Sequence, residues 1–159
     1  MVYEYTIRKG KNGIRLRRGK AVAESLRFNQ ASIAANWMKE HYKTDELGEE
    51  YLWLVAMDAD CNVLGISLVA QGGTNFAVVS TASVAKRVLL LNAVTAILVH
   101  NHPSGTAYFS QEDRKVTERF KTVFQLLDMT LADHIVLGNG YYSYAEEVKA
   151  SSVSLQDVQ

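Results

Sequence analysis

The sequence predicts an α/β domain in which a mixed β-sheet is flanked by helices. Short apolar segments of strand length alternate with longer segments whose apolar residues recur at helical spacing. Two Asn-Gly pairs, at 12–13 and 139–140, indicate tight turns between neighbouring strands. At 159 residues and 48% hydrophobic composition, the chain has enough apolar mass to form one globular core.

The N-terminal segment predicts a basic β-hairpin. Apolar and polar residues alternate over residues 2–18, on both sides of the turn at 12–13. Residues 1–30 contain eight basic and two acidic residues, a net charge of +6, so the remainder of this neutral chain carries −6. Two interpretations stay open: a solvated face packed on the acidic body, or an arm that binds DNA or RNA. The expected nucleic-acid contacts are Arg15, Arg17 and Arg18.

A helix and a linker are predicted next. Asn29 can cap a helix that ends near Tyr42. The buried side of this helix is expected to consist of Ile33, Trp37 and Met38. The polar residues 44–49 then predict a linker, because they lack the periodicity of a helix or a strand.

The middle of the chain predicts the sheet. Residues 51–57 are almost continuously apolar, which is typical of a strand buried on both faces. Residues 63–70 predict a second strand that forms a meander with the first, and residues 71–74 predict a loop. Ser80 or Thr81 can cap the helix that follows. The remaining elements are, in order, the end of that helix near Leu91, a strand at 93–100, a helix at 110–128, a strand at 131–138 and a short return strand at 141–144. The helix at 110–128 is expected to bury Val116, Phe120, Val123 or Phe124, and Leu127.

These elements divide the chain into three parts. Residues 1–48 are expected to form a basic hairpin and a helix packed on the core. Residues 49–150 are expected to form the core itself. The pattern is weak beyond Ala150, so residues 151–159 are expected to be a frayed tail.

Two histidines and a carboxylate indicate a metal site. His100 ends the strand at 93–100 and His102 follows two residues later, and residues two apart in an extended chain point to the same face. Ser110 and Asp113 open the next helix and bring a carboxylate back towards them. Each fragment has another explanation, since histidines at strand ends are often only hydrogen-bonded and Ser-x-x-Asp resembles a capping box. Together, with the Pro-Ser-Gly turn at 103–105 between them, they predict a three-ligand catalytic zinc site with an open fourth position.

The His-x-His-x7-Ser-x2-Asp spacing resembles the motif of the JAMM (MPN-plus) metalloproteases. His-Asn-His-Pro-Ser-Gly at 100–105, Leu-Asn-Ala at 91–93 and Asp-His-Ile-Val-Leu-Gly at 133–138 resemble the bacterial RadC-type JAB domain. The resemblance implies a JAB/MPN-like (cytidine-deaminase-like) architecture. It also implies that His100, His102 and Asp113 bind zinc and that Ser110 is the family's site serine.

The resemblance assigns a general base and a function. The family's glutamate opens a strand that ends in aspartate, which here places it at Glu50, eight residues before Asp58. The implied activity is that of a zinc metallopeptidase or isopeptidase, with Glu50 as general base and Ser110 as donor to the oxyanion. The alternative is a nucleic-acid-associated module of the DNA-repair type, in which zinc is structural or acts on phosphodiesters. Asp133 or His134 either orients the site or is structural.

Composition excludes several other classes. The single cysteine, Cys61, excludes a disulfide framework, a thiolate-rich zinc site and the paired-cysteine pattern of zinc deaminases. The N-terminus lacks the apolar segment of a signal peptide, and no apolar run approaches the roughly 18 residues of a membrane span. We therefore expect a cytoplasmic protein with no membrane partner.

Overall fold

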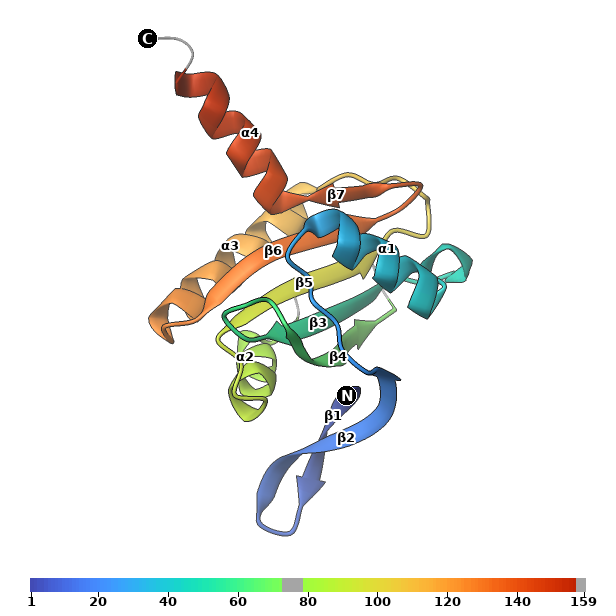
Figure 1. The fold of residues 1–159 in the computed structure, drawn as a ribbon, viewed down its shortest axis with the longest axis vertical. Coiled ribbons are helices and arrows are strands. Elements are labelled where there is room, and N and C mark those ends of the chain that lie inside the picture. The colour runs from blue at the N-terminus through green and yellow to red at the C-terminus, as the bar shows by residue number, and fades with distance from the viewer. Residues whose placement is uncertain (73–78, 157–159) are drawn as a thin grey trace.

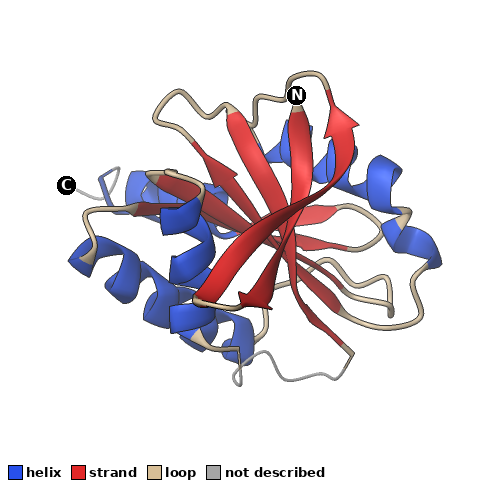
Figure 2. Ribbon diagram, turned by 90° about the horizontal axis from the view of Figure 1, so that it is seen from below, coloured by secondary structure: helices blue, strands red, loops and turns tan. Residues whose placement is uncertain are grey.

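The computed structural model describes residues 1–72 and 79–156, and the side chains of 1–72 and 79–150. A seven-stranded sheet has the order β2-β1-β4-β3-β5-β6-β7, with helices on both of its faces (Figures 1 and 2). The strands are β1 (Val2–Gly10), β2 (Gly13–Ala23), β3 (Tyr51–Met57), β4 (Val63–Gln71), β5 (Thr95–Asn101), β6 (Thr130–Leu137) and β7 (Tyr141–Ser143). The helices are α1 (Ala31–Tyr42), α2 (Thr81–Leu90), α3 (Gln111–Leu126) and α4 (Tyr144–Gln156), with a 3-10 turn, η1 (Thr44–Glu46).

The predicted mixed sheet is confirmed. β3 pairs antiparallel with β4 and β5, β5 runs parallel to β6, and β6 pairs antiparallel with β7. Alternation along β3 divides its side chains between two cores. Leu52, Leu54 and Ala56 pack with residues of α2 and α3. Trp53, Val55 and Met57 pack on the other face with residues of α1. β3 is thus buried on both faces, as its apolar run predicts.

The N-terminal hairpin is longer than predicted. β2 continues to Ala23, and the tip of the hairpin lies at the opposite end of the molecule from α4 (Figure 1). Gly13 has a φ of 122°, which the turn requires and a side chain would disfavour. The hairpin joins the other five strands where β1 lies beside β4, and there the ring of Tyr5 lies over Gly65 of β4. A Cβ added at Gly65 would lie only 2.6 Å from that ring.

The start and the buried side of α1 differ from the prediction. The N-cap residue is Gln30 rather than Asn29, and no side chain caps this end. Ile33 is 43% exposed, whereas Ala34, Ala35 and Met38 are buried. The small alanines let the helix lie close to the sheet, so the contact centres on them and turns Ile33 towards solvent. Trp37 is only partly buried, and His41 stacks on it.

Other boundaries follow the predictions closely. Ser80 caps α2, as predicted, by accepting from the amide of Ser83. α3 buries Val116, Phe120 and Phe124, as predicted. Leu127, which was also expected to be buried, is the C-cap residue and is 41% exposed, because the helix ends before it. The predicted linker contains η1. Of the predicted 71–74 loop, Gln71 belongs to β4 and residues 73–74 lie outside the described residues.

The C-terminal segment is helical for most of its length. α4 continues to Gln156, and residues 157–159 lie outside the described residues. Its first turns are held to α3 by an ion pair of Arg114 with Glu147, in which Nη1 and Nη2 of the guanidinium group each donate to one carboxylate oxygen. The expected fraying beyond Ala150 concerns motion and stays a prediction. None of the helices within 1–72 and 79–156 is long and apolar enough to cross a membrane.

Candidate metal centre

The strand that carries the histidines is central in the sheet. His100 lies on β5 opposite Leu52 of β3, on the face that packs against α2 and α3. His102 follows two residues later, just beyond the end of β5. The turn after it closes with a hydrogen bond from the Gly105 amide to the His102 carbonyl (2.9 Å). Gly105 has a φ of 79° and lies against Asn139, so a side chain at this position would be strained and would clash.

Asp113 reaches the histidines from the first turn of α3. The side chain of Ser110 accepts from the Asp113 amide (3.1 Å), and the Asp113 carboxylate accepts from the Ser110 amide (2.9 Å). This is the capping box that the sequence pattern predicts. The box fixes the carboxylate near the helix start, and Asp113 is only 5% exposed.

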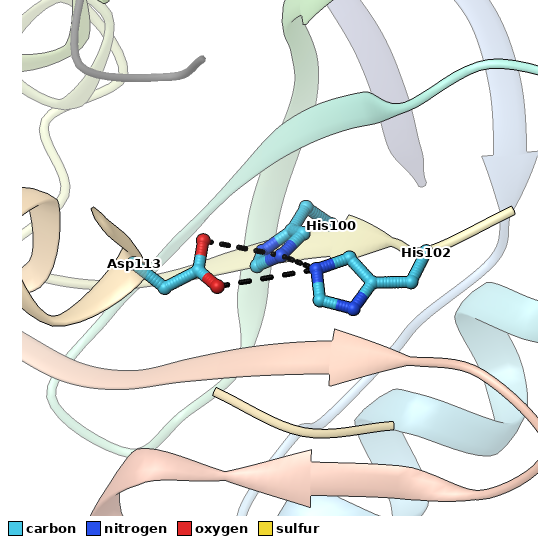
Figure 3. Close-up of side chains that lie close together, drawn as sticks. All are labelled: His100, His102 and Asp113. Atoms are coloured by element: carbon cyan, nitrogen blue, oxygen red, sulfur yellow. Dashed lines mark hydrogen bonds and ion pairs between the residues drawn. The ribbon is translucent and has the colours of Figure 1, made fainter. Parts of the chain in front are cut away.

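The three side chains converge on one point (Figure 3). Nε2 of His100 lies 3.0 Å from Nε2 of His102 and 3.4 Å from Oδ1 of Asp113. Nε2 of His102 lies 3.9 Å from Oδ2 of Asp113. Zinc bonds of about 2.0–2.2 Å at tetrahedral angles place ligand atoms about 3.3–3.6 Å apart. The observed spacings extend to both sides of this range, and one ligand atom from each of the three residues lies within 4.8 Å of the other two, so the group could hold a metal ion.

The hydrogen bonds behind His100 determine which of its nitrogens faces the site. The hydroxyl of Thr117 donates its proton to the carbonyl of Asp113 (2.7 Å). Because that proton is used, Oγ1 of Thr117 can only accept from Nδ1 of His134 (2.7 Å). Nε2 of His134 is then an acceptor and receives the Nδ1 proton of His100 (2.9 Å). We infer that Nε2 of His100 carries a lone pair directed at the site.

His102 also directs its Nε2 towards the site, but a different hydrogen bond determines this. Its Nδ1 lies 2.9 Å from the carbonyl of Thr106, which can only accept, so Nδ1 carries the proton. With these tautomers, Nε2 of both histidines and the Asp113 carboxylate face one another. A cation bound between the three groups would stabilise this arrangement. The donor chemistry therefore fits a divalent metal.

Burial keeps the inner histidines neutral, as metal ligation requires. Burial lowers the pKa of His100 to about 4, against the opposing effect of Asp113. Burial likewise lowers the pKa of His134 well below its usual range. Both side chains are fully buried, so protonation of either one would place a charge in the core.

A pocket of about 480 Å³ opens beside the three ligands. Its lining residues are Glu50, His102, Ser104, Tyr108, Ser110, Glu112 and Asp113. Glu50 precedes β3, and the β3–β5 register, extended by two residues beyond the pair of Leu52 and His100, sets it opposite His102. Burial raises the pKa of the Glu50 carboxyl, while His102 acts to lower it and Asp113 to raise it. The neighbouring Glu49 is exposed, and its carboxylate accepts from Gln71 (3.4 Å).

All five residues singled out from the sequence thus lie at this pocket or its floor: His100, His102, Asp113, Glu50 and Ser110. Their catalytic roles stay predictions. The hydroxyl of Ser110 donates to Oδ2 of Asp113 (2.6 Å). Of the two residues weighed as orienting groups, His134 contacts His100, whereas Asp133 caps the start of α4 through Ser143 (2.6 Å) and Ala145 (2.9 Å).

Two participating residues were missed. Thr117 sets the orientation of His134, and the only sequence signal for it is the four-residue spacing from Asp113, which places both on one face of a helix. Asn101 lies between the two histidines in the sequence but binds the backbone of the segment around Glu50. Its position within the His-Asn-His motif is a signal that could have drawn attention to it.

Comparison with known proteins agrees with the motif. A family model described as "RadC-like JAB domain" matches residues 28–149. The chain is 41% identical over 106 residues to a UPF0758 protein of Idiomarina loihiensis, covering 65% of this chain and 47% of that protein. It is 36% identical over 121 residues to a UPF0758 protein of Stutzerimonas stutzeri, covering 75% of this chain and 54% of that protein. A UPF0758 protein of Thermotoga maritima is 34% identical over 102 residues, covering 64% and 46% respectively.

The match includes every element that builds the pocket. It begins before α1, ends within α4, and contains both histidines, Asp113 and Glu50. The chain spans about half the length of the relatives that it matches. Because the family model covers most of the chain, the motif and the fold together lead to one assignment. The chain belongs to the RadC-like JAB domain family.

Proposed function

We propose that this chain is a zinc-dependent metallopeptidase or isopeptidase. The observation that carries the proposal is the convergence of three potential ligand atoms beside an open pocket whose wall contains Glu50. Structural zinc sites are closed by four protein ligands, whereas catalytic sites use three and keep one position open. Among the described residues, the ligand group has three members.

The side chains of the pocket can divide the work of amide hydrolysis. A zinc ion held by His100, His102 and Asp113 would supply a Lewis acid and lower the pKa of a water molecule from about 15.7 towards about 7. Glu50, which lines the pocket, would accept a proton from the attacking water and return it to the leaving amine. Burial shifts the pKa of the Glu50 carboxyl upwards, towards neutral pH, and a carboxyl whose pKa lies nearer the working pH can act both as a base and as an acid. The hydroxyl of Ser110 can donate to the developing oxyanion if it rotates away from Asp113.

Digestion of defined substrates tests this proposal. Zinc-loaded protein is incubated with a peptide library, with lysine-linked isopeptides and with a phosphodiester, and products are identified by mass spectrometry. We expect cleavage of at least one amide class, loss of cleavage on chelation and recovery on addition of zinc. Cleavage of the phosphodiester alone would favour the alternative function. No cleavage of any substrate by fully loaded protein would contradict an enzymatic role for this chain.

A second candidate function, nucleic-acid binding, is favoured by the charges of the hairpin. Arg8 and Arg15 lie directly opposite each other in the β1–β2 pair, and Arg17 follows on the same face. All three are exposed, and none forms an ion pair with any described residue. Like charges opposite each other destabilise a strand pair, and an anionic partner would remove this cost. The predicted contact Arg18 instead lies over the ring of Tyr3, 4.6 Å from its centroid.

The affinity for DNA and RNA, measured at several salt concentrations, tests this second candidate function. We expect weak, sequence-independent binding of DNA or RNA whose affinity falls steeply with salt, because neutralised phosphates release counterions. Arg15→Ala with Arg17→Ala should weaken binding of all sequences and reduce the salt slope by about 2. Lys86→Ala with Lys115→Ala removes the same charge from exposed helix positions and serves as the control. Equal binding by both pairs would show that the hairpin is not the contact surface.

A further inference from the structure

Asn101 connects the strand of the metal ligands to the segment that carries Glu50. It is the last residue of β5 and is 1% exposed. Alternation along β5 turns its side chain to the face opposite that of His100 and His102. The side chain therefore does not line the pocket, and its hydrogen bonds go to the entrance of β3.

The Asn101 amide holds the backbone on both sides of Glu50. Its Oδ1 accepts from the amide of Tyr51 (2.8 Å), and its Nδ2 donates to the carbonyl of Glu49 (2.9 Å). One planar group thereby fixes the residues immediately before and after Glu50. On the other side, the carbonyl of Glu50 accepts from the Gly72 amide of the neighbouring chain segment (2.9 Å). The backbone of Glu50 is thus restrained from both sides.

These bonds lie where the register of the β3–β5 pair has to be maintained. The ladder extends from Met57 opposite Thr95 to Leu52 opposite His100. Beyond Leu52, the side chain of Asn101 provides the connection between the two segments. A shift of one residue at this point would turn the Glu50 side chain to the opposite face of the sheet.

We propose that Asn101 is a positioning residue that holds Glu50 over the metal pocket, a role that rests on the proposed hydrolytic function. Because Asn101 stands between His100 and His102 in the chain, one short segment sets the position of both the metal and the base. If β5 shifted, the hydrogen bonds of Asn101 would carry the segment of Glu50 along with the two histidines. Asn101 itself touches neither substrate nor metal.

A merely structural role for Asn101 makes a different prediction. As a satisfied buried amide it would affect the free energy of unfolding, but folded protein would keep its turnover number. A positioning role lowers kcat in protein that is folded and fully loaded with zinc. It also requires the effect to pass through Glu50, so the loss should disappear when Glu50 has already been changed.

The test compares kcat, KM, zinc content and melting temperature for Asn101→Ala, Asn101→Asp, Glu50→Gln and the double variant Glu50→Gln with Asn101→Ala. Misplacement of a reacting group by about 1 Å can cost about 100-fold, so we expect Asn101→Ala to lower kcat by about 10- to 100-fold with KM and zinc unchanged. The double variant should be no slower than Glu50→Gln alone. Asn101→Asp preserves the side-chain shape and the acceptor but loses the donor to Glu49, and should also lower kcat.

Gln71→Ala is the matched control. It removes side-chain hydrogen bonds to Tyr51 and Glu49 at the same entrance of β3, but none to the backbone beside Glu50. We expect it to keep wild-type kcat. Wild-type kcat in folded Asn101→Ala, or fully additive losses in the double variant, would overturn the positioning role.

A crystallographic comparison separates this inference from the proposed function. Zinc-loaded wild type and Asn101→Asp are compared for the position of the Glu50 carboxylate relative to the metal. We expect the carboxylate to move or to become disordered in the variant while the three ligands keep their places. An unchanged carboxylate would refute the positioning role even if the protein cleaves no substrate. Absent hydrolysis with a displaced carboxylate would refute only the proposed function.

Discussion

Glu50→Gln is expected to abolish hydrolysis while the fold and the zinc content stay intact. The amide keeps the shape of the glutamate but cannot accept a proton from water. General acid–base catalysis contributes about 100- to 10,000-fold, so turnover should fall by that order. Turnover and zinc content are measured on the same preparation, which separates loss of the base from loss of the metal.

Glu49→Gln is the control for this prediction, because the two carboxylates lie on different faces. Glu50 lines the pocket, whereas Glu49 is exposed and contacts Gln71. We expect Glu49→Gln to be close to wild type. An inactive Glu49→Gln with an active Glu50→Gln would show that the assignment is off by one residue. Full activity of both variants would mean that neither glutamate is the base.

Loss of a metal ligand is expected to have the second large effect. Wild-type protein should hold about one zinc per chain, and His100→Ala, His102→Ala and Asp113→Ala should each lose most of it. His134→Ala should weaken zinc binding by about 10- to 100-fold, because it removes the acceptor that orients His100. The measurements are metal analysis after dialysis and competition with a chromophoric chelator.

His41→Ala is the control for a histidine outside the site, since its ring stacks on Trp37 of α1. It should retain full zinc occupancy. Retention of full occupancy by all three ligand variants would remove His100, His102 and Asp113 from the ligand set. A loss of zinc in His41→Ala equal to that in the ligand variants would show that the assay reports unfolding instead.

The sequence predicts the metal ligands well because their geometry is local. Alternation aligns His100 with His102, and the helix start fixes Asp113 through its bonds with Ser110. The caps of α2 and α3 were predictable for the same reason. Glu50 could be assigned only by family resemblance, since its approach to His102 depends on the pairing of β3 with β5, which local pattern does not specify.

The roles that local sequence pattern left open or predicted wrongly depend on tertiary contacts. His134 reaches His100 because β6 lies beside β5, and Thr117 reaches His134 because α3 packs on that part of the sheet. Ile33 fits the spacing of a buried stripe, yet α1 packs through Ala34 and Ala35. Helical periodicity allows neighbouring stripes, and the distance between helix and sheet decides among them.

The most direct measurement is a crystal structure of the zinc-loaded protein with anomalous data on both sides of the zinc absorption edge. We expect one strong peak about 2.0–2.2 Å from Nε2 of His100, Nε2 of His102 and the Asp113 carboxylate. Its fourth position should face the pocket that contains Glu50. A peak at other residues, a fourth protein ligand closing the site, or no peak at full zinc loading would show that these three residues do not form an open catalytic zinc site.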